Sequence, residues 1–579
     1  MSRTARLVAK SPARSERGMV VAHNIEGAET GASILRAGGN AFDAAVAMSF
    51  VTAVRETAMN SVGGVGVLLA HSGTTGETTE INFYGRTPAG LSEDVFVPYL
   101  YDTSSSMFGW KGVEGTRNER GFLSVGVPTY VSGLAELHAR HATMPWQELL
   151  QPAVALARTG FAVDEEDLAS FATHLEHLQG YDEINRIFLT NGIPFPDGIY
   201  QGSGRPVTQP DLATTIEQVA VDGTDAFYRG DIGNSICDYV QAGGGVLSAS
   251  DLAQYRPEVT SGLRSTYRDY ELVTSSGMTG GLTLIEMLNL AEQIDLRSRD
   301  RWSVQCLHLI AEIMRQAWTD RFVYVGDPEG TTVPADALID KAYAATLLEG
   351  FADDQVAKHT RPGNPWPFSR LTPAPTSVAG DPGGRDTTHI AAADSQGNLV
   401  TFTQTLGLAF GSCVVTPGTG VNLYDVTMWM NPEPGTPNSV GPSKKQLGHA
   451  TPVMLFKDGE PIVALGAPGA RRVVTAMFQC IINIVDFGMD VQEAIGAPRL
   501  HCEGADPSAP IGPTVRTVVI DDRVRSDTLD GLAQRGHEVE TVYETGTQSS
   551  LAKPLGIQLD DGELVGGVDV FRKSIGIGI

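Results

Sequence analysis

Cysteine is scarce in this sequence of 579 residues. The five cysteines form no CxxC pair and stand far apart, at Cys237, Cys306, Cys413, Cys480 and Cys502. An odd number of widely spaced cysteines excludes a disulfide framework, and the spacing is not that of a zinc site. The pattern is typical of a protein in a reducing compartment.

Positive charge is also in short supply, and long apolar runs are missing. The 42 lysines and arginines face 68 aspartates and glutamates, which gives a formal net charge of −26. Such an acidic chain is unsuited to nucleic acid or an anionic membrane surface, because both require basic residues. No run of 18 apolar residues occurs, and the polar, basic residues 1–18 lack the apolar segment of a secretory signal. We therefore expect a cytoplasmic protein with neither nucleic-acid nor membrane partners.

The sequence does contain enough apolar residues for a large core, since 42% of it is hydrophobic. Residues 19–22 predict a short strand, and residues 26–36 predict a helix that ends at Gly38. Asn40 can cap a second, alanine-rich helix with an apolar residue at every fourth position. This order predicts helices that pack closely against a sheet.

The middle of the chain, roughly 120–350, reads as mainly helical. Residues 146–160 and 302–324 show helical periodicity. The acidic run 164–167 is predicted to be the solvated first turn of a helix. His174 and His177 are three residues apart but lack an obvious third ligand, so surface histidines explain them better than a metal site.

The pattern changes at 361–386, where six prolines and several glycines predict a linker. Directly after it, 387–393 and 399–405 read as two strands joined by a turn at Gly397-Asn398. The two-residue period of a strand places Thr401, Thr403 and Thr405 on one face. On spacing alone, a structural threonine-rich ribbon explains this hairpin, because threonine favours strands.

A family resemblance adds a second interpretation. The hairpin, from Thr387-Thr388-His389 to Thr405, resembles the signature of the γ-glutamyltranspeptidase family. The opening block at 18–45 is similar to the start of the same family. Further matches follow in the family's order, at Gly126-Val127-Pro128, Pro417 to Gly420, Thr451-Pro452 and Gly466 to Gly469.

The resemblance implies an α+β fold, the four-layer αββα sandwich of N-terminal-nucleophile hydrolases, with a helical region in the large fragment. It also implies one precursor that cuts itself between Asp386 and Thr387. The products would be a large subunit, 1–386, and a small subunit, 387–579, which stay associated in one core; higher homo-oligomers are compatible with this. No feature of the sequence requires a cofactor or a metal.

The chemistry expected of Thr387 follows from its new position at a chain end. A threonine hydroxyl needs a base within hydrogen-bond reach, and a free α-amine with a pKa of about 8 provides one. By similarity, Thr405 would orient Thr387, and the backbone N–H groups around Gly469 and Ala470 would form the oxyanion hole. Ala470 replaces a glycine of the family, which matters only if the backbone there needs a glycine conformation.

The γ-glutamyl pocket of the family does not carry over to this sequence. Its carboxylate-binding arginine aligns with Tyr84, although Arg86 lies two residues further on. Together the departures remove most of the groups that would hold an amino-acid zwitterion. They predict a substrate with an apolar or ring portion, lined by Tyr84, Arg86, Gly407, Val426, Trp429, Gly448 and His449.

Several functions stay open at this point. The leading hypothesis is hydrolysis of an amide or related acyl bond of a non-γ-glutamyl substrate. Relatives in alkylproline antibiotic pathways suggest a C–C bond hydrolase, and a small-amide (oxamate-like) hydrolase or a true γ-glutamyl hydrolase or transferase are further alternatives. An inactive binding scaffold is the rival from another class; Thr387 and Thr405 together argue against it.

Overall fold

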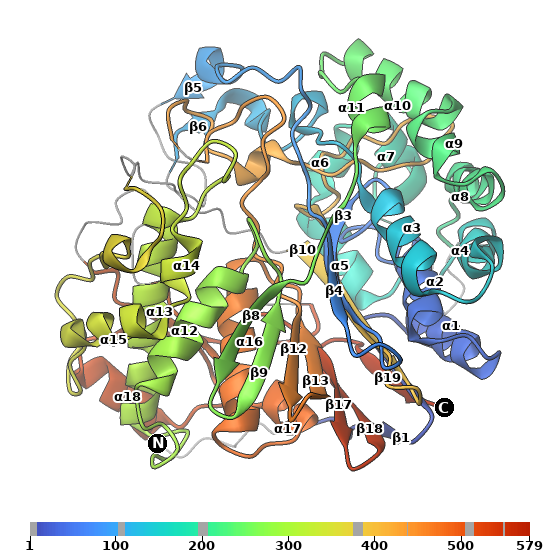
Figure 1. The fold of residues 1–579 in the computed structure, drawn as a ribbon. Helices are drawn as coiled ribbons and strands as arrows, with labels where there is room; N and C mark the ends of the chain where they lie inside the picture. Colours follow the sequence, from blue (N-terminus) through green and yellow to red (C-terminus); the bar gives the residue numbers. More distant parts are fainter. Residues whose placement is uncertain are drawn as a thin grey trace.

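The computed structural model describes residues 8–101, 110–194, 206–373, 386–436, 438–503, 514–547 and 550–579. Within these residues two antiparallel sheets of seven strands lie face to face at the centre of the molecule (Figure 1). The first sheet has the order β19 (Ile575–Gly578), β2 (Gly18–Ala22), β10 (Asp386–Asp394), β11 (Leu399–Gly407), β3 (Val65–His71), β4 (Thr78–Phe83), β7 (Glu258–Thr260). The second has the order β1 (Ala13–Ser15), β18 (Glu563–Val568), β17 (Leu555–Asp560), β13 (Glu460–Gly466), β12 (Val453–Lys457), β9 (Tyr270–Thr274), β8 (Leu263–Tyr267).

One layer of helices covers the outer face of the first sheet, on the right of Figure 1. Its alanine-rich helix α2 is buried along its whole length, which allows the close packing that the sequence predicts. Asn40 caps α2 as expected, because its side-chain oxygen accepts from the N–H groups of Phe42 and Asp43. The helices of this side are α1 (Ile25–Arg36), α2 (Ala41–Arg55), α3 (Tyr130–His141), α4 (Trp146–Thr159), α5 (Glu165–Thr173), α6 (Leu175–Gln179), α7 (Asp182–Phe188), α8 (Pro210–Asp222), α9 (Thr224–Tyr228), α10 (Asp231–Ala242) and α11 (Ala249–Gln254).

A second layer of helices covers the outer face of the other sheet, on the left of Figure 1. At its centre is the long helix α13, which is buried from Cys306 to Tyr324. The helices of this side are α12 (Gly281–Glu292), α13 (Val304–Tyr324), α14 (Ala335–Leu338), α15 (Lys341–Leu347), α16 (Arg471–Val485), α17 (Val491–Gly496) and α18 (Ser526–Gln534). A small sheet, β14 (Leu500–His501), β15 (Thr517–Asp521) and β16 (Glu538–Val542), and the pair β5 (Leu100–Tyr101) and β6 (Gly112–Val113) complete the described strands.

The α+β, four-layer αββα sandwich is therefore confirmed. Apolar residues from the facing sides of both sheets, such as Val21, Ala391 and Met454, form the central layer of the core. No helix among the described residues is both long and apolar enough to cross a membrane.

The linker predicted at 361–386 is only partly described. Residues 361–373 contain one short 3-10 turn, Trp366–Phe368, and 374–385 lie outside the described residues. The predicted boundary was slightly too late, since β10 already begins at Asp386. The backbone of Asp386 pairs with Gly407 of β11, and this pairing makes Asp386 the first residue of β10.

Candidate functional site

The two threonines singled out by the sequence meet at one end of the central hairpin. Thr387 lies on β10 and Thr405 on β11, and the Thr387 hydroxyl donates to the Thr405 hydroxyl oxygen at 3.3 Å. The Thr405 oxygen also accepts from the N–H of Gly407 at 2.9 Å. Both threonines are buried. The pair is therefore fixed in position and shielded from bulk water.

A β-bulge lies at the nucleophile. Asp386 pairs with Gly407 and Thr388 with Gln404, so Thr405 and Leu406 together stand opposite Thr387. A bulge of this kind interrupts the ladder and re-aims a side chain. Here it releases Thr387 from regular pairing while its neighbours hold the strand in place.

His389 joins the nucleophile's strand to the other sheet. Its Nδ1 and Nε2 are hydrogen-bonded to the hydroxyls of Thr403 at 2.9 Å and Thr401 at 3.0 Å. Thr401 in turn donates to the carbonyl of Leu465 on β13. A Cβ at Gly466 would overlap the His389 ring, so glycine is required there for the two sheets to approach this closely. These bonds fix β10 against the strand that leads into the predicted oxyanion loop.

The predicted oxyanion loop connects β13 to the N-terminus of α16. Gly469 has φ +137°, and a Cβ added to it would lie 2.8 Å from the Cα of Ala552. The Pro468 carbonyl accepts from the N–H of Lys553 at 3.2 Å. Backbone N–H groups at the start of a helix are suited to stabilise negative charge, because the helix dipole is positive there. The arrangement supports a role for this loop in binding an oxyanion.

Ala470 adopts a backbone conformation that favours glycine. Its φ is +51° and its ψ is −130°, where an L side chain is strained by about 1–3 kcal/mol. The replacement of the family's glycine by alanine therefore has a structural cost at this position. Strain of this kind concentrates at functional sites, where the surrounding structure maintains it.

Most of the predicted substrate-binding residues come together beside this loop. A Cβ on Gly448 would overlap the ring of Tyr84. The His449 ring lies 5.8 Å from the Trp429 ring, and Trp429 packs in the same apolar cluster as Ala470. The group is predominantly aromatic and buried, as the sequence predicts.

The buried guanidinium of Arg321, on α13, holds the Gly448 segment in place. It donates to the carbonyls of Gly448 at 2.7 Å and Thr279 at 2.9 Å.

The guanidinium of Arg86, in contrast, is bound to residues outside the aromatic group. It forms an ion pair with Glu329 at 3.1 Å and donates to the carbonyl of Ser443 at 2.8 Å. These bonds engage the Arg86 guanidinium, and Arg86 lines a cavity of about 440 Å³ together with Tyr84.

Gly407 is paired with an acidic residue that the sequence analysis missed. Gly407 has φ +95°, and a Cβ there would overlap the carboxyl oxygen of Asp425. The Asp425 carboxyl is fully buried, accepts from the N–H of Leu408 at 2.9 Å, and has its pKa raised well above the usual range by burial. The sequence signal that could have identified Asp425 is its position directly before Val426, which the family resemblance places in the pocket. Asp425 leaves no room for a longer side chain at position 407.

A buried ion pair that the sequence analysis did not identify holds the segment against which the predicted oxyanion loop packs. The ammonium of Lys553 forms a buried ion pair with Glu544, and the same carboxylate accepts from the N–H groups of Ser550 and Leu551. Because Lys553 also bonds Pro468 through its backbone, the pair fixes the segment against which Gly469 packs. The two residues are nine positions apart in a region without a recognisable motif, so no sequence pattern identifies the pair.

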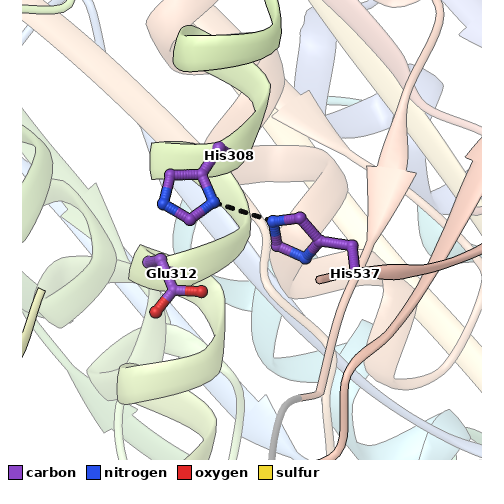
Figure 2. A group of neighbouring side chains, drawn as sticks. All are labelled: His308, Glu312 and His537. Atoms are coloured by element: carbon purple, nitrogen blue, oxygen red, sulfur yellow. Dashed lines mark hydrogen bonds between the residues drawn. The ribbon is translucent and has the colours of Figure 1, made fainter. Parts of the chain in front are cut away.

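Three potential metal ligands are grouped on the other side of the second sheet, as Figure 2 shows. His308 Nδ1 and His537 Nε2 are 2.8 Å apart, and His308 Nε2 donates to the carbonyl of Ala352 at 2.7 Å. Arg315 lies between the remaining atoms, 3.0 Å from Glu312 and 3.5 Å from His537 Nδ1. Because a guanidinium neutralises the carboxylate and occupies the second histidine, these residues fit a hydrogen-bonded network better than a cation. The network connects α13 to His537, which lie on opposite sides of the predicted cleavage site in the sequence.

His174 and His177 do not form a metal site in the described structure. His174 ends α5, and its Nδ1 is hydrogen-bonded to the carbonyl of Ser170, whereas His177 lies on the separate helix α6.

The buried histidines predict sensitivity to acid. Burial lowers the pKa of His389 and His537 from 6.5 to about 3. The unfolded chain therefore binds protons below pH 6.5 that the folded chain cannot accept, and stability falls as the pH drops from there towards 3, by about 1.4 kcal/mol per histidine and pH unit. Calorimetry should show an unfolding temperature that decreases steadily from neutral pH to about pH 5. His537→Asn should flatten the decrease; an unchanged unfolding temperature in the wild type would contradict the prediction.

Fold and site together define a class of enzyme. An αββα sandwich with a threonine at the start of a central strand, oriented by a second threonine, is the arrangement of the N-terminal-nucleophile hydrolases. Residues 27–579 match the family model described as gamma-glutamyltranspeptidase, and the chain belongs to this family.

Individual relatives agree with this assignment. The chain is 33% identical to the Acylase ACY 1 proenzyme of Pseudomonas sp. (strain V22), over 92% of this chain and 88% of the relative. It is 31% identical to the glutathione hydrolase proenzyme of Bacillus subtilis (strain 168), over 97% and 91%. The crystal structure of cephalosporin acylase from Bacillus halodurans shares the fold, with a TM-score of 0.85 over 100% of this chain and 99% of that one at 24% identity. The protein is thus a threonine hydrolase of this family, made as a precursor that processes itself into a large and a small subunit.

Proposed function

We propose that this protein cuts its own chain between Asp386 and Thr387 and then uses Thr387 to hydrolyse an amide whose acyl part carries an apolar ring. The subunits would be residues 1–386 and 387–579. The position of Thr387 supports this cut, since its hydroxyl is oriented by Thr405 at a bulge that frees it from the ladder.

Self-cleavage requires the Thr387 hydroxyl, the Asp386 carbonyl and one water molecule. The Thr387 oxygen forms a bond to the Asp386 carbonyl carbon, and the carbon–nitrogen bond between the two residues breaks as the nitrogen takes the proton that the hydroxyl loses. Water then hydrolyses the resulting ester, which leaves a carboxylate on Asp386 and a free amine on Thr387. That amine, with an ordinary pKa of about 8, is a suitable base near neutral pH.

Turnover repeats the same chemistry on a substrate. The α-amine takes the hydroxyl proton while the Thr387 oxygen attacks the amide carbon, and it passes this proton to the departing amine. The acyl group stays on Thr387 until water releases it. Backbone N–H groups at Gly469 and Ala470 would stabilise the oxyanion; one such donor is worth about 3 kcal/mol of barrier.

The close packing of Tyr84 on Gly448 is the observation that carries the substrate assignment. A Cβ at position 448 would overlap the Tyr84 ring. The tyrosine at position 84 therefore requires a glycine at position 448. The ring occupies the space that a side chain at position 448 would need. With Arg86 already paired to Glu329, a zwitterion would be buried without partners, which is costly. The pocket therefore favours the acylase type of substrate over the γ-glutamyl type.

Two chromogenic amides with the same leaving group test this assignment. We expect kcat/KM for an aromatic-acyl p-nitroanilide to exceed that for γ-glutamyl-p-nitroanilide by about 100-fold, since burying one ring is worth about 1.5–3 kcal/mol. Tyr84→Ala should lose about 10-fold on the aromatic amide, mostly in KM, while Tyr84→Phe keeps the ring and should stay near the wild type. Preferential turnover of the γ-glutamyl amide, or of a ring-opened keto acid through C–C cleavage, would contradict the proposal.

A further inference from the structure

A second cavity opens at the same end of the first sheet as the nucleophile. Its volume is about 660 Å³. Ala22 on β2 pairs with Ile390 on β10. The next residue, His23, lines the cavity and therefore lies beside the start of β10. The wall residue Met59 accepts a hydrogen bond from the N–H of Leu406 at 2.9 Å. The cavity wall is thus one residue from Thr405.

The cavity and the aromatic pocket lie on opposite sides of the nucleophile's hairpin. In the first sheet, β2 and β19 flank β10 on one side, and β3 and β4 flank β11 on the other. His23 and Ile575 border the cavity on the β2 side, whereas Tyr84 follows β4. A substrate with its acyl ring at Tyr84 and its carbonyl at Thr387 would extend its amine portion towards the cavity.

The cavity is rich in carboxylates. Five carboxylates line it against three basic side chains: Glu26, Glu56, Asp164, Glu166 and Asp167 face Arg55, Arg572 and Lys573. The local potential is therefore negative and favours a cationic ligand.

Part of this charge is already neutralised within the wall. The run 164–167, predicted from the sequence to be a solvated first turn, instead binds Arg55: Asp164 and Asp167 both form ion pairs with its guanidinium. Glu26 forms a third at 3.1 Å, and Lys573 pairs with Asp164. These partners explain why the acidic run is half-buried. Two carboxylates of the wall form no ion pair within 4.0 Å among the described residues: Glu166, which accepts from the N–H of Lys573 at 3.1 Å, and Glu56.

Four polar atoms of the wall are buried without a hydrogen-bond partner. They are His23 Nε2, Glu56 Oε2, Ser170 Oγ and Arg572 Nε. The His23 side chain is only 5% exposed, and its other nitrogen is bound to Ser574 at 2.7 Å. Glu56 uses its other oxygen to accept from Asn24 at 2.7 Å. An unpaired buried polar group costs about 1–3 kcal/mol, so four of them around one cavity point to a ligand that supplies the missing bonds.

We infer that this cavity binds the amine portion that leaves during hydrolysis, and that it selects leaving groups with a primary ammonium group, held by Glu56. This inference rests on the proposed amide hydrolysis. The ammonium donates to Glu56 Oε2, a charge-assisted bond inside a negative cavity. His23, Ser170 and Arg572 remain for hydrogen bonds to oxygen atoms of the same leaving group. The class of substrate is thus an aromatic acyl amide of a diamine-type amino acid.

Lysine and norleucine provide a matched pair of leaving groups, since they differ in the terminal ammonium. With the same aromatic acyl group on the α-nitrogen, we expect the lysine amide to show about 10-fold higher kcat/KM than the norleucine amide, mainly through KM. Glu56→Gln keeps an oxygen for Asn24 but removes the charge, and should bring the kcat/KM values of the two amides together, chiefly by lowering that of the lysine amide. Glu29→Gln, an exposed carboxylate of α1 outside the cavity, makes the same charge change and should leave the 10-fold preference intact.

Calorimetric titration of the processed protein with free lysine and free norleucine separates this inference from the proposed function. Lysine should bind about 10-fold more tightly than norleucine, and Glu56→Gln should remove the difference. Lysine-selective binding without turnover of either amide would overturn the amide hydrolysis and keep the binding site. Equal binding and equal turnover of both compounds by the wild type, or an unchanged preference in Glu56→Gln, would overturn the site.

Discussion

Thr387→Ala should yield an uncut chain of 61.6 kDa with amide turnover reduced by at least about 1,000-fold. The substitution removes the hydroxyl that attacks the Asp386 carbonyl and then the substrate carbonyl, and the uncut chain also lacks the amine that serves as base. Gel electrophoresis and a chromogenic amide assay on the same preparation measure both effects.

Thr387→Ser is the matched control for this result. It keeps an attacking hydroxyl on the same strand, so processing and turnover should persist, although more slowly. Unfolding temperatures close to that of the wild type would show that neither substitution disrupts the core. Normal processing of Thr387→Ala would exclude Thr387 as the residue that cuts the chain.

The second large effect is expected at the oxyanion loop. Gly469→Ala should lower turnover per processed molecule by about 100- to 1,000-fold, the loss typical of removing one oxyanion donor. The backbone at φ +137° is strained for any L side chain, and the added Cβ would come within 2.8 Å of the Ala552 backbone. The loop would therefore have to move away from Lys553, to which it is bonded through Pro468.

The neighbouring position should respond in the opposite direction. Ala470→Gly relieves an alanine held at φ +51° and ψ −130°, so it should raise the free energy of unfolding by about 1 kcal/mol and retain activity. Thermal unfolding and a kcat/KM measurement compare the two variants directly. If Gly469→Ala were fully active, or Ala470→Gly less stable than the wild type, the described loop geometry would be wrong.

Local patterns predicted much of the fold. The cap at Asn40, the helices after it and the hairpin from 387 to 405 all follow from spacing and turn residues within short windows. The face of β11 that carries Thr401, Thr403 and Thr405 also follows from the two-residue period. These features depend on neighbours in sequence, so one sequence suffices to find them.

Long-range pairings were beyond reach of the sequence alone. Arg55, the last residue of α2, meets Asp164, the N-cap of α5, only in the folded chain, and Arg86 forms an ion pair with Glu329 of a loop distant in sequence. The close approach of Asp425 to Gly407 likewise joins separate segments, with the N–H of Asp425 donating to the carbonyl of Leu406 at 3.1 Å. The sequence identified residues of the aromatic pocket, but only the fold shows that Tyr84 fills the space above Gly448.

The N-terminal sequence and intact mass of the fragments in purified wild-type protein test the central claim most directly. The account predicts two associated fragments, with the small one beginning Thr-Thr-His-Ile, residues 387–390, and continuing to Ile579. Such a result would place the free α-amine on the threonine that Thr405 orients. A single intact chain, or a fragment that begins at any other residue, would contradict Thr387 as the nucleophile and with it the proposed mechanism.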